Sequence, residues 1–249
     1  MDTRDIPYNN QTINDESVIS LENIAQGYGD KRVLADISYN FQKNKITAIL
    51  GKSGSGKTTL LQTINGMVKP KSGIVKLFGQ PIRYESIHAT RLKIGYVVQN
   101  IGLFPHLTIQ KNMSVLAHIA KAETKSIVAR INYLMDLVQL PSTYLMKYPH
   151  QLSGGEQQRV GLCRAMFLNP PVLLMDEPFA SLDDETKGSI FQDMLKSQKN
   201  EPRTVVLITH NKQEALTLAD YFVWLREGKI VRQGDKEQLK QLLSENIDL

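Results

Sequence analysis

A glycine-rich loop between an apolar run and a helical stretch constrains the fold of this chain more than any other feature. Residues 51–59 read Gly-Lys-Ser-Gly-Ser-Gly-Lys-Thr-Thr, which fits the pattern G-x-x-x-x-G-K-[ST]. The apolar run Ile46 to Leu50 is a predicted strand that leads into the loop, and a helix is predicted to begin directly after it. This succession of strand, loop and helix predicts an α/β domain whose loop binds phosphate groups.

The residue types of the loop suit a phosphate ligand. Its glycines let the backbone curl so that successive N–H groups point inward, and the positive end of the following helix adds to the anion site. Lys57 supplies a full charge for the β- and γ-phosphates, and the hydroxyl of Thr58 can bind Mg²⁺. The predicted ATP contacts in this loop are Gly51, Ser53, Gly54, Ser55, Gly56, Lys57, Thr58 and Thr59.

Another apolar run ends in two acidic residues. Residues 171–178 read Pro-Val-Leu-Leu-Met-Asp-Glu-Pro, and a continuously hydrophobic strand is typical of a parallel sheet covered on both faces. Carboxylates at the C-terminal end of such a strand lie where ligands bind in open α/β sheets. Asp176 is therefore the predicted partner of Mg²⁺, directly or through water, and Glu177 is the candidate general base. An acidic helix N-cap after a core strand is the structural alternative.

A third segment, Leu152-Ser-Gly-Gly-Glu156, has the chemistry of a helix start. Ser153 is a candidate N-cap, and Gly154 and Gly155 allow the backbone to approach an anion closely. Ser153 together with Glu156 also fits a capping box, which needs no ligand. Beside the phosphate loop, however, the segment resembles the signature of ATP-binding cassette (ABC) proteins, in which Gln is the commoner fifth residue.

Further segments match the same family in the family's order, and the resemblance spans roughly residues 18 to 240. Gln99, which closes an apolar strand, matches the family's Q-loop glutamine, whose amide can reach Mg²⁺. His210 follows the strand 204–209 and matches the switch histidine, which contacts the γ-phosphate. Residues 181–183 resemble the D-loop, which touches the partner subunit. Tyr28 stands where the family places an aromatic ring on adenine, although a Tyr beside an edge strand can also simply cover core.

The resemblance to the ABC family implies a role for each of these residues in ATP binding or hydrolysis. The predicted catalytic residues are Lys57, Gln99, Glu177 and His210, the predicted Mg²⁺ ligands are Thr58, Gln99 and Asp176, and the predicted contacts to the second ATP of a dimer are Ser153, Gly154 and Gly155.

The family implies an ATP-hydrolysing subunit that powers a membrane transporter. It implies a homodimer in which each ATP lies between the phosphate loop of one subunit and the signature of the other, together with transmembrane permease subunits. Residues 101–109 resemble bacterial importers of glycine betaine, choline or polar amino acids, whose full systems can include an extracytoplasmic solute-binding protein. An exporter subunit is the alternative, and a non-transport cassette a weaker one. Directly after the D-loop aspartate, Asp183, this chain has Asp184 where many importers have Pro.

Composition restricts the setting of the chain. Hydrophobic residues make up 41% of the 249 residues and charged residues 22%, as in ordinary globular proteins. No apolar run is long enough to span a bilayer, and the N-terminus lacks signal-peptide regions. The formal net charge of +5 comes from Lys and Arg scattered among acids, which argues against a nucleic-acid partner and suits an anionic membrane surface. We expect a peripheral protein on the cytoplasmic face of the inner membrane. The single Cys163 is assigned no chemistry.

These patterns predict a P-loop NTPase of the α/β class with a mostly parallel core sheet, an antiparallel β subdomain and an inserted helical lobe. Residues 1–16 are a predicted polar tail, and residues 17–249 the predicted ABC ATPase domain, with the lobe at about 107–165. Strands are expected at 18–24, 33–41, 46–50, 93–98, 172–176, 204–209, 222–225 and 229–231. Helices are expected at 114–122 and 127–138, and residues 236–249 are expected to form a last helix with no regulatory domain after it.

Overall fold

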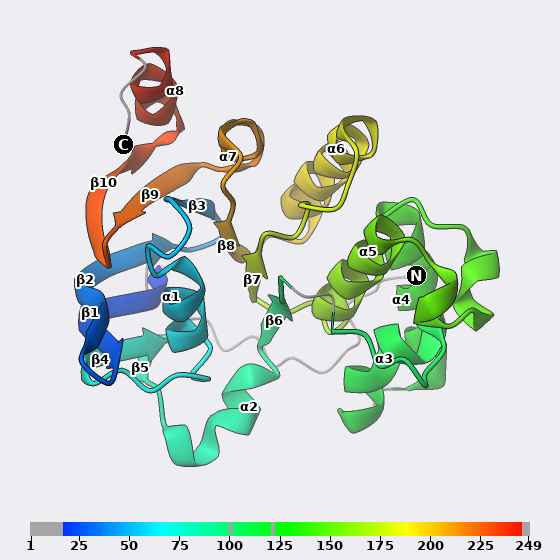
Figure 1. Ribbon diagram of the computed structural model, residues 1–249. Coiled ribbons are helices and arrows are strands. Elements are labelled where there is room, and N and C mark those ends of the chain that lie inside the picture. The colour runs from blue at the N-terminus through cyan, green and yellow to red at the C-terminus, as the bar shows by residue number, and fades with distance from the viewer. Residues whose placement is uncertain (1–16, 100–101, 121–122, 246–249) are drawn as a thin grey trace.

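The computed structural model describes residues 17–99, 102–120 and 123–245 (Figure 1). The strands are β1 (Ser17–Tyr28), β2 (Lys31–Gln42), β3 (Ile46–Leu50), β4 (Ser72–Leu77), β5 (Gln80–Pro81), β6 (Ile94–Val97), β7 (Val172–Asp176), β8 (Thr204–Ile208), β9 (Tyr221–Arg226) and β10 (Lys229–Asp235). The α-helices are α1 (Lys57–Ile64), α2 (Ile87–Arg91), α3 (Ile109–Ile119), α4 (Thr124–Leu137), α5 (Gly154–Met166), α6 (Asp184–Asn200), α7 (Lys212–Leu218) and α8 (Lys236–Ser244). Short 3-10 turns are η1 (Tyr84–Ser86), η2 (Ser142–Met146) and η3 (Pro149–Gln151).

The core of the molecule is a six-stranded sheet with the order β10-β9-β3-β8-β7-β6. Its neighbours pair in parallel except for β10, which forms an antiparallel hairpin with β9. Every residue of β3, β7 and β8 is buried, which is why these strands read as unbroken apolar runs. The mostly parallel core sheet predicted from the sequence is confirmed. The predicted bounds of β2, β3, β6, β7, β8 and β9 agree with the observed ones to within two residues, whereas β1 and β10 each continue four residues past their predicted ends.

An antiparallel sheet of order β2-β1-β4-β5 packs over α1. The β1–β2 hairpin agrees with the prediction, but the apolar pattern of the sequence did not reveal β4. The first three residues of β4 are exposed and Gly73 interrupts it, so its own pattern is weak. Pairing with β1, in which Ile19 faces Leu77 and Leu21 faces Val75, makes it a strand.

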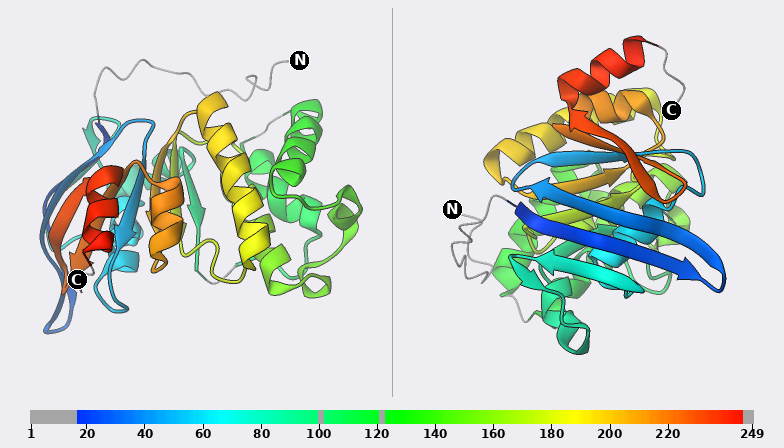
Figure 2. Two further views of the ribbon diagram at one scale, coloured as in Figure 1. Left: turned by 90° about the horizontal axis from the view of Figure 1, so that it is seen from above. Right: turned by 90° about the vertical axis from the view of Figure 1, so that its left-hand side faces the viewer.

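Helices α3, α4 and α5 lie on the opposite side of the molecule from the antiparallel sheet (Figure 2), and α5 packs directly against β6 of the core sheet. Their apolar faces belong to one buried cluster that also includes residues of β7 and β8. Helix α3 begins at Ile109, earlier than the predicted start at Ser114, because Thr108 caps it by accepting a hydrogen bond from the Lys111 N–H. A helical segment therefore lies between β6 and β7, where an insertion was predicted.

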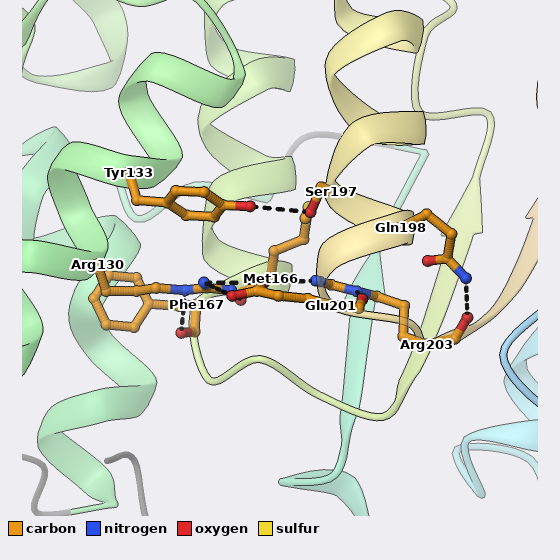
Figure 3. Close-up of polar contacts among 8 residues, drawn as sticks. All are labelled: Arg130, Tyr133, Met166, Phe167, Ser197, Gln198, Glu201 and Arg203. Carbon is orange, nitrogen blue, oxygen red and sulfur yellow. Dashed lines mark hydrogen bonds and ion pairs between the residues drawn. The ribbon is translucent and has the colours of Figure 1, made fainter. Parts of the chain in front are cut away.

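A buried charge cluster, which we call the Arg130 cluster (Arg130, Glu201 and Arg203), ties α4 to its neighbours (Figure 3). The Arg130 guanidinium donates to the carbonyls of Met166 at 2.8 Å and Phe167 at 3.1 Å, where α5 ends. It also donates to the Glu201 carboxylate at 3.1 and 3.2 Å, and Arg203 donates to the same carboxylate at 2.9 Å. The end of α5 and the turn between α6 and β8 are thus held to α4 by one side chain.

Two of the predictions concern the ends of the chain, where they include residues that the structure does not describe. The polar tail predicted over residues 1–16 lies outside them, and so do residues 246–249 of the predicted last helix, whose described part is α8. Across the described segments, no helix combines the length and the apolar character needed to cross a bilayer.

Candidate nucleotide site

The phosphate loop connects the end of β3 to the start of α1, and its glycines are required by its backbone. Gly51, Gly54 and Gly56 have φ angles of 151°, 77° and 103°, which L-residues with a side chain rarely adopt. A Cβ on Gly51 would lie 2.2 Å from the carbonyl oxygen of Leu225 in β9, and one on Gly56 would lie 2.8 Å from that of Val33 in β2. The loop is therefore fixed between strands of both sheets.

The loop presents hydrogen-bond donors that a phosphate group could use. Helix α1 has Gly56 at its N-cap, and among the described residues no side chain accepts a hydrogen bond from the N–H groups of its first turn. These N–H groups therefore remain available to a ligand. The buried Ser55 hydroxyl likewise has no hydrogen-bond partner among the described residues. Lys57 Nζ lies over the loop, donating to the carbonyls of Gly51 at 2.7 Å and Lys52 at 2.9 Å. These groups fit a bound phosphate chain.

Asp176 lies at the C-terminal end of β7, directly beside the loop. Only 2% of its surface is exposed, and the Thr58 hydroxyl, at the start of α1, is close enough to influence the pKa of its carboxyl group. Burial raises the pKa of Asp176, and the Thr58 hydroxyl partly opposes that shift. Burial lowers the pKa of Lys57, which the charges of Glu177 and Asp176 oppose. A second cation beside Asp176 would stabilise its ionised form further.

The oxygens near Asp176 suit magnesium. Mg²⁺ prefers hard oxygen ligands and usually binds proteins through one or two carboxylates, completing its shell with water and substrate phosphates. Asp176 and Thr58 lie at the adjoining ends of β7 and α1, and Gln99 follows the adjacent strand β6. Within the described residues no cluster of three or more His, Cys, Asp or Glu side chains forms a ready-made metal site. One carboxylate and one hydroxyl fit a Mg²⁺ ion that takes its other ligands from water and substrate phosphates.

Glu177 lies between two of the other predicted catalytic side chains, Gln99 and His210. Its carboxylate accepts from Gln99 Nε2 at 3.4 Å and lies 3.4 Å from His210 Nδ1. Both distances are at the outer limit of hydrogen bonding, so these contacts are weak and can be rearranged by a ligand. The His210 side chain is 67% exposed. The structure thus brings Gln99, Glu177 and His210 together from the ends of three different elements.

A cavity of about 530 Å³ joins these groups to the phosphate loop. The residues that line it are Lys31, Val33, Ser53, Gly54, Gly56, Lys57, Thr58, Thr59, Gln99, Glu177 and His210. Lys31 and Val33, at the start of β2, were missed by the sequence reasoning, and the only signal was a basic residue after a Gly-Tyr-Gly-Asp turn. Tyr28 is not one of the lining residues; it ends β1 with 54% of its surface exposed, so its stacking role stays a prediction.

The signature residues lie apart from this cavity, at the start of α5. Ser153 caps the helix, and the Glu156 carboxylate accepts from the Ser153 N–H at 2.7 Å and from the Tyr144 hydroxyl at 3.1 Å. The backbone hydrogen bond to Ser153 is the main reason that the pKa of Glu156 is lowered. Ser153 and Gly154 are exposed, and a Cβ on Gly154 would meet no heavy atom within 4 Å. The capping box is present, and Ser153 and Gly154 form an open surface beside it.

Comparison with known proteins gives concordant matches. The family described as "ABC transporter" matches residues 34–180. The glycine betaine uptake system ATP-binding protein YehX of Escherichia coli (strain K12) is 40% identical over 88% of this chain, and the choline transport ATP-binding protein OpuBA of Bacillus subtilis (strain 168) is 39% identical over 89%. The chain spans 71% of the length of the first relative and 58% of the second.

Solved structures agree with these sequence matches. The dimeric structure of MJ0796, described as a bacterial ABC transporter cassette, superimposes with a TM-score of 0.82 at 29% identity, over 88% of this chain and 98% of that one. A dimeric post-hydrolysis state of the same cassette, bound to ADP and Pi, gives a TM-score of 0.82 at 28% identity, again over 88% and 98% of the two chains. On the fold, the phosphate loop and these matches, the chain belongs to the ABC transporter family, as one of its ATP-hydrolysing cassettes.

Proposed function

We propose that this cassette works as a homodimer that powers a bacterial importer of a small osmoprotectant of the glycine betaine or choline type. In this proposal each ATP is bound between the phosphate loop of one subunit and the signature of its partner. Closure of the dimer on ATP, and its reopening after hydrolysis, would act on transmembrane permease subunits at the cytoplasmic face of the membrane. An extracytoplasmic solute-binding protein would deliver the substrate.

The observation that carries the proposal is the separation of the two halves of the site within one chain. The cavity beside the phosphate loop includes Lys57, Gln99, Glu177 and His210, whereas Ser153 and Gly154 lie exposed at the start of another helix. A second copy of the chain can present the same surface in return, so that one interface completes both sites. The dimeric cassettes among the structural relatives support this arrangement.

The residues of each site have distinct proposed roles. Lys57 and the N–H groups at the start of α1 would hold the β- and γ-phosphates, and Thr58, Asp176 and Gln99 would hold Mg²⁺, which neutralises phosphate charge when bound. Glu177 would orient the attacking water and accept its proton. His210, next to the Glu177 carboxylate, would contact the γ-phosphate. Positioning and charge neutralisation are the main requirements of phosphoryl transfer.

We assign the importer class and its substrate by analogy with the relatives of this chain. YehX is described as part of a glycine betaine uptake system and OpuBA as a choline transport protein, and each is about 40% identical to this chain. The test is to purify the tagged chain with the permease that it binds and to measure uptake of labelled glycine betaine and choline into vesicles. Uptake of neither compound, by a complex that still hydrolyses ATP, would reject the substrate class and leave the ATPase standing.

The proposed role of Glu177 as general base is tested with Glu177→Gln. This change removes the base but keeps the shape of the side chain, so ATP binding should persist while turnover falls about 10²- to 10⁴-fold. Because the closed dimer would then persist, the variant should elute as a dimer with ATP and as a monomer without it. Glu237→Gln, which changes an exposed carboxylate in α8, is the matched control and should keep wild-type turnover. Near-normal turnover of Glu177→Gln would contradict the role.

A further inference from the structure

The side-chain amide of Gln158, in α5, spans the turn that joins β7 to α6. Its Nε2 group donates to the backbone carbonyl of Glu177 at 3.0 Å, and its Oε1 atom accepts from the backbone N–H of Ser181 at 3.0 Å. A carbonyl can only accept and an N–H can only donate, so the two partners fix the orientation of the amide. Gln158 is 3% exposed, so no solvent competes for either bond.

The first turn of α5 is packed closely against the same turn. A Cβ on Gly155 would lie 3.0 Å from the carbonyl oxygen of Ser181 and 3.1 Å from the side chain of Leu182. A larger residue than glycine would therefore push the helix away from the turn. This close approach places Gln158, almost one helical turn further along, within reach of both backbone groups.

Glu177 needs such support, because its backbone is strained. Its φ angle is +48°, in the left-handed region, which residues with a side chain rarely adopt. Its N–H donates to the carbonyl of Ile208 in β8 at 3.0 Å, and its carbonyl accepts from Gln158. The backbone that aims the Glu177 carboxylate is thus held from the core sheet on one side and from α5 on the other.

We propose that Gln158 is a positioning residue for ATP hydrolysis, which keeps the Glu177 carboxylate in its working direction and makes that direction depend on the place of α5. The inference rests on the proposed function, because it assigns Glu177 the role of general base. Helix α5 begins at Ser153 and Gly154, the surface offered to the partner's nucleotide. A shift of α5 on engaging that nucleotide would move the Glu177 carbonyl through one buried hydrogen bond, so that each signature would adjust the base of its own subunit.

The test replaces Gln158 by Met, which keeps its length and removes both hydrogen bonds. In the full chain, kcat should fall about 10- to 100-fold, the effect of misplacing a reacting group by about an ångström, whereas the Kd for ATP should change less than about threefold. Gln157→Met is the matched control, because Gln157 is the preceding residue of the same helix and its amide donates to the Leu152 carbonyl instead. This control should keep the wild-type kcat.

A double-mutant cycle separates positioning from a general loss of stability. If Gln158 acts through Glu177, then adding Gln158→Met to Glu177→Gln should lower the residual rate, measured with radiolabelled ATP, by less than about twofold. An equal fold-loss in both backgrounds, or a Gln158→Met variant with the wild-type kcat, would overturn the inference. The proposed function itself fails differently, through an inactive wild-type chain or an unaffected Glu177→Gln variant.

Gln158→Glu is the second variant, for the case that Gln158→Met does not fold. It keeps the acceptor for Ser181 and loses the donor to Glu177, so its kcat should fall while the Ser181 N–H stays protected from hydrogen exchange. In Gln158→Met that N–H should exchange faster as well. Wild-type kcat in Gln158→Glu would show that the bond to Glu177 does not position the base, and the inference would then be wrong.

Discussion

At the scale of single residues, Glu156 shows how a departure from the family's commoner residue is accommodated. Its carboxylate accepts from the Ser153 N–H and from the Tyr144 hydroxyl, so the charge is bound within its own helix start. Hydrogen bonds to an ionised acceptor are stronger than those to a neutral amide, and a negative charge in the first turn of a helix is favoured by the helix dipole. Glu156 therefore stabilises the helix start beside the open surface of Ser153 and Gly154.

The lowered pKa of Glu156 predicts a pH-dependent effect of Glu156→Gln. Because the pKa is lower in the folded than in the unfolded chain, the carboxylate stabilises the fold fully above its unfolded pKa of about 4.3, and this contribution is lost as the pH falls through the folded pKa. The gap in Tm between the wild type and Glu156→Gln should thus be largest near neutral pH and shrink below about pH 4. Tyr144→Phe should show a smaller version of the same trend. A gap independent of pH would contradict it.

Some site residues could be predicted from the sequence because their chemistry is local. The phosphate loop, Asp176 and Glu177 each follow a buried strand, so neighbouring residues alone reveal them. Lys31, Val33 and Gln158 could not be predicted in this way, because each acts on a segment that is distant in the sequence. Gln158, for example, contacts residues about twenty positions later, and only the packing of α5 on the turn after β7 makes that contact.

At the scale of secondary-structure elements, the strands that are buried throughout are the ones that the sequence predicts best. Strands β3, β7 and β8 are buried throughout and were predicted nearly to the residue, whereas β4 has an exposed start and was missed. Pairing with another strand, rather than its own pattern, determines β4. The fold class could therefore be predicted, while the full membership of the antiparallel sheet could not.

The Arg130 cluster predicts a large loss of stability in Arg130→Met. The substitution leaves the carbonyls at the end of α5 without their donor and removes one partner of the largely buried Glu201 carboxylate, which together should cost about 3–5 kcal/mol. Urea unfolding of the nucleotide-free chain measures this loss. Lys125→Met, at an exposed position of the same helix, is the control and should change the free energy of unfolding by less than about 0.5 kcal/mol. A loss below about 1 kcal/mol in Arg130→Met would show that the cluster does not anchor α4.

We predict that the permease binds at Phe104, in the segment between β6 and α3. The backbone N–H and carbonyl of Phe104 are both hydrogen-bonded by the fully buried side chain of Asn112, at 2.8 and 3.0 Å, while 42% of Phe104 is exposed. The ring is thus held at the surface by a fixed backbone. Phe104→Ala should weaken co-purification of the permease and leave ATP binding and Tm unchanged. Met67→Ala, at another exposed apolar position, should keep the permease bound. Loss of folding in Phe104→Ala would instead assign the ring to the core.

At the scale of the whole molecule, the separated halves of the site predict rescue between two inactive chains. Lys57→Ala should remove ATP binding at the phosphate loop, and Ser153→Arg should block the signature surface. A mixed dimer with shared sites has one site with both lesions and one site with neither, so mixing the two chains in the assembled transporter should restore part of the ATPase activity. Each variant assembled alone is the control and should stay inactive. Proven mixed dimers without any activity would exclude independent shared sites.

The position of β3 in the middle of the core sheet also has a consequence for folding during synthesis on the ribosome. All five residues of β3 are buried, and both of its neighbours, β8 and β9, are strands that leave the ribosome long after it. At about 5–20 residues per second, the roughly 150 residues between β3 and β8 take about 10–30 seconds to synthesise. Through that interval the backbone N–H and C=O groups on both edges of β3 lack their strand partners and its mostly apolar side chains are uncovered, which favours association with other chains. Successful production of the cassette therefore depends on shielding β3 in the nascent chain until residues 204–226 have emerged.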